Sequence, residues 1–335
     1  MKPFFPLLAC LVVLPVPART GSDAAWSTPV VDLRVGLSRA RDKDPSLAVG
    51  AGQAGYLALE RGGVIGVLLP LSTDGFNSRQ RVALSEYASL RSSLESSRRF
   101  AFDDCRSQPA RISVWFELEA PNELAESPST VRRWIERGVR VFGIGGEHDN
   151  ELATVSTDTA PGPVTGLTRI GRDVVTEVLA AGALVDVSGA SDPSIDDVLE
   201  LAERFHAPVI ATHSNARALA DRAGNFRDST IRAIAHSGGL IAVTAARDLL
   251  AAGRSAKLDH LVHQIVYMVQ IAGPEHVALG TGFESGVGPV RDFHGANDLP
   301  RLAVSLRSAG LSAPDVERVL YRNAQRLLCA AHATK

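Results

Sequence analysis

The sequence predicts a single (β/α)8 barrel of the TIM type. Eight short apolar runs rich in β-branched residues alternate with stretches of helical periodicity along the 335 residues. Continuous apolar runs are typical of parallel strands that are buried on both faces, and eight βα units in series form a closed barrel. Because no internal repeat or change of composition divides the chain, one barrel is favoured over two domains.

The expected elements follow from these runs and from residues that start or stop helices. Gly138 and Gly182 stand where helices end before strands, and Asp192 before Pro193 predicts a helix that Asp192 caps. Ser312 opens the last helix, which we expect to close the bottom or the flank of the barrel. The strands are expected at residues 30–33, 64–69, 112–116, 139–142, 184–187, 209–211, 240–243 and 277–279.

The charge balance argues against a nucleic-acid partner. The chain has 35 Lys and Arg against 37 Asp and Glu, a formal net charge of -2, and it contains no run of basic residues that would track phosphates. Aromatic residues make up only 5% of the chain, so few side chains are available to stack on bases. A small molecule is therefore the expected partner.

The N-terminus resembles a secretory signal. Lys2 precedes an apolar run at residues 4–16, and Val16-Pro17-Ala18 offers small residues for cleavage. The run is short and contains prolines, so a retained membrane helix is disfavoured. An uncleaved anchor and a lipid on Cys10 stay open as alternatives. We expect a secreted, periplasmic or envelope-associated protein.

The expected organisation is a signal peptide at 1–18, a short linker at 19–28, the barrel at 29–330 and a tail at 331–335. Removal of the signal would leave two cysteines, Cys105 and Cys329. Two cysteines can form one disulfide, but their spacing does not decide whether they pair or stay free.

Chemistry in such a barrel lies at the carboxyl ends of the strands. Glu117 and Glu119 alternate onto one face at the end of the third expected strand, as paired acids would. His213 follows the sixth expected strand. The candidate pocket comprises polar residues at or just beyond strand ends: Arg34, Glu117, His148, Asn150, Asn215 and Glu284.

Several longer motifs carry a resemblance to a known family. They include Pro208-Val209-Ile210-Ala211-Thr212-His213-Ser214-Asn215-Ala216-Arg217, Gly238-Gly239-Leu240-Ile241 and Asn297-Asp298-Leu299-Pro300. Over residues 30–328 the chain resembles the renal (membrane) dipeptidase family of zinc metallopeptidases. The resemblance implies a (β/α)8 barrel of the metallo-dependent hydrolase type, dipeptide hydrolysis by two bridged zinc ions, and a homodimer.

The resemblance also assigns positions in the site. Glu119 falls at the glutamate that bridges the two ions, and His213 falls at the histidine after strand six. Four other ligand positions hold residues that do not bind zinc: Arg34, Gly36, Gly189 and Gly282. The family's transition-state histidine falls at Gly146, and the arginine that holds the substrate carboxylate falls at Gly224.

Two ligands are too few for a tight dinuclear site, and a buried Glu119 without cations needs a partner. We expect Arg34 to pair with it. The residues thus predict a non-catalytic or impaired relative that binds a small dipeptide-like ligand and holds zinc weakly or not at all. The alternative is an active dipeptidase with one metal or a rebuilt site, for which further candidates are Glu147, His148, Asp149, Glu284, Asp292 and His294.

Overall fold

The computed structural model describes a subset of the chain, and every structural statement below concerns that subset. The described residues are 28–36, 52–72, 81–103, 105, 111–119, 121–125, 127, 129–146, 148–156, 163–251, 256–285 and 290–331. The expected signal peptide and Glu147 lie outside them.

Eight parallel strands form a closed barrel, as the sequence predicts. The strands of the described part are β1 (Val30–Asp32), β2 (Val64–Ser72), β3 (Phe100–Phe102), β4 (Ile112–Glu119), β5 (Val139–Gly143), β6 (Leu184–Asp186), β7 (Val209–Ser214), β8 (Leu240–Val243) and β9 (Val277–Leu279). Their order is β2-β1-β9-β8-β7-β6-β5-β4-β3, and a pairing between β2 and β4 closes the ring. All eight predicted strands are confirmed.

The strand β3 was not expected from the sequence. It pairs with residues 112–114 of β4, whereas β5 pairs with residues 116–118. β3 therefore pairs with the first residues of β4, and β5 pairs with the residues of β4 that follow. Its three residues, one of them alanine, are too short a run to stand out as a strand from pattern alone.

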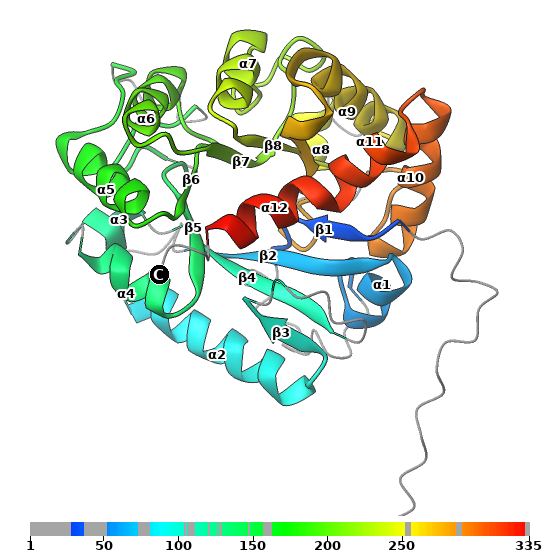
Figure 1. Ribbon diagram of the computed structural model, residues 1–335, viewed down its shortest axis with the longest axis horizontal. Helices are drawn as coiled ribbons and strands as arrows, with labels where there is room; N and C mark the ends of the chain where they lie inside the picture. The colour runs from blue at the N-terminus through cyan, green and yellow to red at the C-terminus, as the bar shows by residue number, and fades with distance from the viewer. Residues whose placement is uncertain are drawn as a thin grey trace, which may run out of the picture.

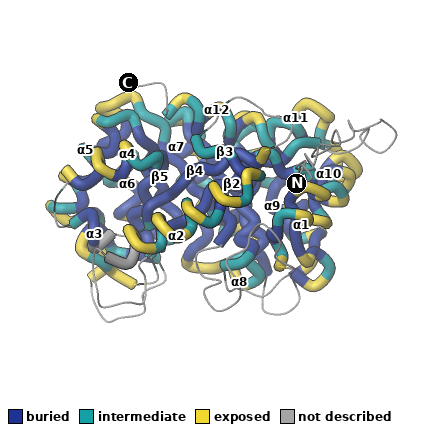
Figure 2. The backbone as a smooth tube through the Cα atoms, turned by 90° about the horizontal axis from the view of Figure 1, so that it is seen from below, coloured by how far each residue is buried: buried dark blue, intermediate teal, exposed yellow. Residues whose placement is uncertain are grey.

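Helices surround the barrel (Figure 1). They are α1 (Tyr56–Arg61), α2 (Arg81–Ser97), α3 (Pro121–Ala125), α4 (Thr130–Glu136), α5 (Arg169–Ala180), α6 (Asp192–Phe205), α7 (Asp228–His236), α8 (Arg247–Leu250), α9 (Leu258–Ala272), α10 (Leu299–Ser308), α11 (Ala313–Glu317) and α12 (Asn323–Ala330). Short helical turns, η3 (Pro274–His276), η4 (Ala296–Asp298) and η5 (Arg318–Arg322), complete the described elements. Figure 2 shows buried residues in the interior and exposed residues on the outer helices.

The helix starts and stops agree with the sequence except at one cap. Gly138 and Gly182 have φ of 97° and 71°, a left-handed conformation that suits the residue after a helix. For α6, however, Ser191 is the capping residue, because its backbone is extended and its side chain accepts from Ser194 N. The expectation for Asp192 is wrong, since Asp192 is already inside the first turn.

The C-terminal helix closes one end of the barrel. In Figure 1 α12 lies across the ring of strands. Ala324, Leu327 and Leu328 pack in one buried cluster with Val31 and Trp115 of the strands. Because these strand residues fill the interior, the helix seals the end opposite to the expected active face. A disulfide between Cys105 and Cys329, 224 residues apart, fastens this helix to the segment after β3.

Among the described residues, no helix combines the length and the apolar character that a membrane crossing requires.

Candidate functional site

Arg34 lies just beyond β1 and reaches across the barrel to β4. Its guanidinium is bidentate on Glu119: Nη1 donates to Oε1, and Nη2 donates to Oε2 at 2.9 Å. Nη1 also lies 3.4 Å from Glu117 Oε2. The arginine side chain is 7% exposed and Glu117 is fully buried. The expected contact between Arg34 and Glu119 is therefore present, and Glu117 shares it.

The pKa values of the two glutamates are shifted in opposite directions because their surroundings differ. Burial raises the pKa of Glu117 well above its usual range, and the nearby charges of Asp186 and Glu119 raise it further. Burial also disfavours the charged form of Glu119, but Arg34 and His213 outweigh it and lower the pKa of Glu119. Arg34 therefore favours the charged form of Glu119, whereas burial and the neighbouring carboxylates favour the neutral form of Glu117.

Asp186, the last residue of β6, completes the cluster. Its Oδ1 accepts from Ser188 Oγ at 2.7 Å and from Thr212 N at 2.9 Å, and its Oδ2 accepts from Thr212 Oγ1 at 2.7 Å. Burial opposes its ionisation, but a hydrogen bond with Glu117, the charge of His213 and the bonds from Ser188 lower its pKa. Asp186 is therefore a second buried carboxylate beside the Arg34 pair.

Three residues of the described part could share a metal ion. One ligand atom each from Glu119, Asp186 and His213 lies within 4.8 Å of the other two. Glu119 and His213 were expected from the resemblance, whereas Asp186 was missed as a ligand. The sequence does contain a signal for Asp186, which is an acidic residue inside an otherwise apolar strand. A carboxylate at a buried strand position is stable only when other groups hydrogen-bond to it or neutralise its charge.

Asp32 is a further buried carboxyl group, at the end of β1. It accepts from Thr281 N at 2.9 Å, from Thr281 Oγ1 at 2.5 Å and from Arg34 N at 3.1 Å. Burial raises the pKa of Asp32 to about 6, although these hydrogen bonds act in the opposite direction. The group therefore links stability to pH.

We expect Asp32→Asn to remove part of the pH dependence of folding. The folded chain keeps the Asp32 proton up to about pH 6, whereas the unfolded chain releases it near its ordinary value of about 3.9. This contribution is complete below about pH 4 and is lost as the pH rises through 6. In urea unfolding from pH 4 to 7, the unfolding free energy of wild type minus that of the variant should fall by about 2 kcal/mol. Parallel curves would contradict this assignment.

The backbone is unfavourable for a longer side chain at three of the positions that the resemblance assigns to ligands. A Cβ on Gly36 would lie 2.6 Å from Ser285 Cα and 2.8 Å from Ser285 N. Gly189 and Gly282 have φ of 75° and 74°, a conformation that is strained for any other residue. A longer side chain would therefore clash with the backbone at Gly36 and would be strained at Gly189 and Gly282.

The other residues of the candidate pocket have structural partners. Asn150 Oδ1 accepts from Leu152 N at 2.9 Å, and Asn215 joins β7 to β8 through Thr244 N at 3.1 Å and Thr244 O at 3.2 Å. Glu284 Oε1 accepts from Ala54 N at 3.1 Å. His148 is exposed. Of the six predicted pocket residues, the structure brings Arg34 and Glu117 together.

The expected replacement ligands do not assemble among the described residues. Asp149 Oδ1 accepts from Val155 N at 2.7 Å, and Asp292 Oδ1 accepts from Leu258 N at 2.8 Å. His294 N donates to Asp298 Oδ2 at 2.7 Å. These polar groups therefore stabilise their own loops. Among the described residues, the candidate metal ligands that lie close together are Glu119, Asp186 and His213, and none of the expected replacement ligands is among them.

Two metal ions do not fit the residues present. Both oxygens of Glu119 accept from Arg34. The carboxylate that would bridge two metal ions is therefore already occupied by the Arg34 guanidinium. Both oxygens of Asp186 accept from Ser188 or Thr212. A second cation beside a guanidinium would also be repelled by it. The donor set suits one ion at most, and only if Arg34 moves.

A closed (β/α)8 barrel with carboxylates and an imidazole at the carboxyl ends of its strands defines the class of metallo-dependent hydrolases. The model of one family, described as membrane dipeptidase (peptidase family M19), matches residues 90–335. The chain belongs to that family.

Solved structures of low sequence identity share the fold. A metallo peptidase from Rhodobacter sphaeroides, liganded with a phosphinate mimic of the dipeptide L-Ala-D-Ala, has a TM-score of 0.81 at 19% identity and covers 92% of this chain and 100% of its own. A probable dipeptidase from Pseudomonas aeruginosa has a TM-score of 0.79 at 19% identity and covers 93% and 96%.

The curated relatives match over a shorter stretch. An uncharacterized protein encoded in the pqqA 5′ region of Klebsiella pneumoniae is 36% identical over 177 residues, which are 52% of this chain and 62% of that protein. An uncharacterized dipeptidase of Schizosaccharomyces pombe is 29% identical over 177 residues, 52% and 42% of the two chains. The chain thus spans about half the length of these two relatives.

Proposed function

We propose that this chain binds a small dipeptide-like ligand at the mouth of its barrel and does not hydrolyse it with two metal ions. The observation that supports this most directly is the bidentate contact between Arg34 and Glu119. The guanidinium supplies fixed positive charge where the family's bridging carboxylate would meet its cations. The neighbour liganded with a dipeptide mimic supports the class of ligand.

The backbone supports the same proposal. Gly36, Gly189 and Gly282 fall at three ligand positions by resemblance. A longer side chain would clash with the backbone of Ser285 at Gly36 and would be strained by the positive φ at Gly189 and Gly282. A single reverse substitution therefore does not rebuild the site. For example, Gly36→Asp would place its Cβ against the backbone of Ser285.

A second candidate is a hydrolase with one metal ion. It is favoured by the convergence of Glu119, Asp186 and His213 within 4.8 Å, since three protein ligands are what a catalytic zinc commonly has. This candidate requires that the cation displace the Arg34 guanidinium from Glu119, and it thus predicts competition between the arginine and the metal.

We further propose that the protein functions outside the cytosol. The signal-like N-terminal sequence supports export. The disulfide between Cys105 and Cys329 also supports it, because such bonds persist in oxidising compartments and are rare where thiols are kept reduced.

The two candidates differ in metal content and turnover. We expect the purified full chain, equilibrated with zinc and freed of excess, to retain well under one ion per chain by elemental analysis and to leave L-Ala-D-Ala intact. Calorimetry should detect binding of the same dipeptide, and EDTA should not change its affinity.

Two variants sharpen this test. His213→Ala removes a candidate ligand, whereas His263→Ala removes an exposed histidine of α9 and is the matched control. One retained ion with turnover, both lost in His213→Ala alone, would establish the one-metal candidate. Two retained ions with turnover, or no dipeptide binding, would overturn the proposed function.

A further inference from the structure

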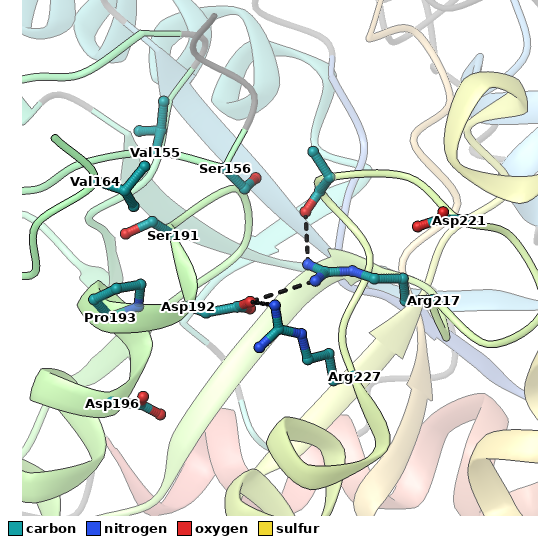
Figure 3. A pocket seen from close by; sticks show the side chains of 11 residues that line it. Val155, Ser156, Val164, Ser191, Asp192, Pro193, Asp196, Arg217, Asp221 and Arg227 are labelled. Carbon is teal, nitrogen blue, oxygen red and sulfur yellow. Dashed lines mark hydrogen bonds and ion pairs between the residues drawn. The ribbon is translucent and has the colours of Figure 1, made fainter. Parts of the chain in front are cut away.

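A pocket of about 630 Å3 opens between the loops that follow β5, β6 and β7 (Figure 3). Its volume is within the range of roughly 300–1,000 Å3 that small-molecule sites occupy. The pocket lies beside the carboxyl ends of these strands. It is lined by Val155, Ser156, Val164, Ser191, Asp192, Pro193, Asp196, Arg217, Asp221, Ala223 and Arg227.

The pocket is distinct from the Arg34 cluster but adjoins it. None of Arg34, Glu119 and His213 lines it. One wall residue, Ser156, donates to Gly189 O from its N at 2.8 Å and from its Oγ at 3.0 Å. Gly189 is one residue after Ser188, which contacts Asp186. The pocket thus has its own lining and is linked to the Arg34 cluster through Gly189 and Ser188.

Charges of opposite sign are in direct contact inside this pocket. Asp192 Oδ2 lies 3.3 Å from Arg217 Nη1 and 3.0 Å from Arg227 Nη2. Arg217 is held further by Asn225 O at 2.8 Å and Ala223 O at 3.1 Å, so it is a fixed part of the wall. Figure 3 shows both guanidinium groups directed toward Asp192.

Arg227 differs from Arg217 in its freedom to bind a ligand. Its side chain is 63% exposed, and its side chain does not cap α7. A guanidinium has five N–H donors in a planar fork, and the contact with Asp192 uses one edge of it. The remaining donors suit a carboxylate, which an arginine binds in bidentate fashion.

The opposite part of the wall is apolar. Val155, Val164 and Pro193 line it, and Val164 is 67% exposed although it is a large aliphatic side chain. Covering exposed aliphatic surface is favourable in proportion to the area removed from water. A ligand with an aliphatic side chain would therefore gain affinity over one without it.

We propose that this pocket binds a free α-amino acid with an aliphatic side chain. The ligand's ammonium group binds the Asp192 carboxylate, its carboxylate binds Arg227, and its side chain covers Val164. Asp192 and Arg227 are in direct contact at 3.0 Å. A ligand that binds both must therefore carry its ammonium and its carboxylate close together, and in an α-amino acid one carbon separates these two groups. This inference does not depend on the proposed function.

Calorimetry with L-leucine tests the proposal directly on the full chain. We expect L-leucine to bind, and leucinamide and N-acetylleucine, which each lack one charge, to bind at least tenfold more weakly. Glycine should bind more weakly than leucine because it lacks the aliphatic side chain. Arg227→Gln should weaken leucine binding about tenfold or more.

The matched control is Arg301→Gln, which alters an exposed arginine of α10 that has one ion pair, to Asp298 at 3.8 Å. It should leave leucine binding unchanged. Absence of leucine binding, equal binding of N-acetylleucine, or equal loss in both variants would overturn the proposal. Complete displacement of leucine by L-Ala-D-Ala would also overturn it, by placing both ligands in one site, whereas failure of dipeptide binding alone would affect only the proposed function.

Discussion

Replacement of Arg34 by methionine is expected to destabilise the folded chain by about 3–5 kcal/mol. The substitution keeps most of the side-chain volume but removes the charge that pairs with Glu119 and lies 3.4 Å from Glu117. With Asp186 close by, the centre would then hold several carboxyl groups and no fixed cation. Such groups must take up protons or remain charged at a high desolvation cost.

Urea unfolding at neutral pH measures this effect. The matched control is Arg132→Met, because Arg132 pairs with Glu177 at 2.6 Å but is 70% exposed, and exposed pairs contribute about 1 kcal/mol or less. The double variant with Arg34→Met and Glu119→Gln should recover part of the loss, since it removes one of the unpaired charges. Equal destabilisation by Arg34→Met and Arg132→Met would refute the role of the buried pair.

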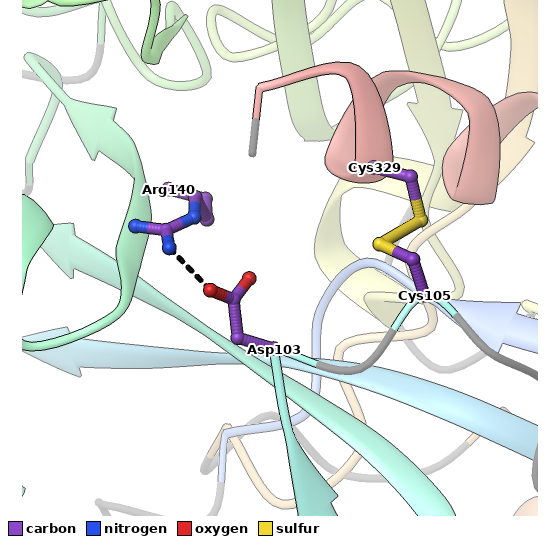
Figure 4. The surroundings of a disulfide bond; sticks show 4 residues. All are labelled: Asp103, Cys105, Arg140 and Cys329. Carbon is purple, nitrogen blue, oxygen red and sulfur yellow. Dashed lines mark hydrogen bonds and ion pairs between the residues drawn. A yellow bond between two sulfur atoms is a disulfide. The ribbon is translucent and has the colours of Figure 1, made fainter. Parts of the chain in front are cut away.

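Loss of the disulfide is expected to lower the free energy of unfolding by roughly 3–5 kcal/mol. The bond joins Cys105 and Cys329 across 224 residues, so it excludes a large set of open conformations from the unfolded chain. It also holds α12 over the end of the barrel, close to the buried ion pair of Arg140 and Asp103 (Figure 4).

Thermal and urea unfolding with and without a thiol reductant test this prediction. Wild type under reducing conditions should unfold at the same midpoint as the double variant Cys105→Ala and Cys329→Ala, and both should fall below the oxidised wild type. The double variant itself should be insensitive to the reductant. An unchanged midpoint on reduction of the wild type would show that α12 holds its place without the bond.

The barrel could be predicted because its strands are local in sequence. Runs such as residues 64–69 and 240–243 are apolar throughout, and only strands buried on both faces require this. β3 escaped notice because three residues carry too little periodic signal. The cap of α6 was assigned to Asp192 instead of Ser191 because both residue types cap helices, and only the backbone conformation distinguishes them.

The candidate site was predictable in part. The pairing of Arg34 with Glu119 followed from charge balance, since a buried carboxylate needs a partner. The participation of Asp186 did not follow, because its oxygens are arranged by Ser188 and Thr212. Asn150, Asn215 and Glu284 were chosen for their place after strands, but their side chains stabilise loops and strand ends.

The sequence by itself determined the barrel and the closing helix, since these depend on residue identity and local periodicity, and the assignment of four positions to absent ligands came from the family resemblance alone. Only the tertiary structure decided how the charges of Arg34 and the buried carboxyl groups pair, and whether the two cysteines bond. The physical reason is separation along the chain: Arg34 meets Glu117 and Glu119 across 83 and 85 residues. Such contacts exist only once the barrel has closed.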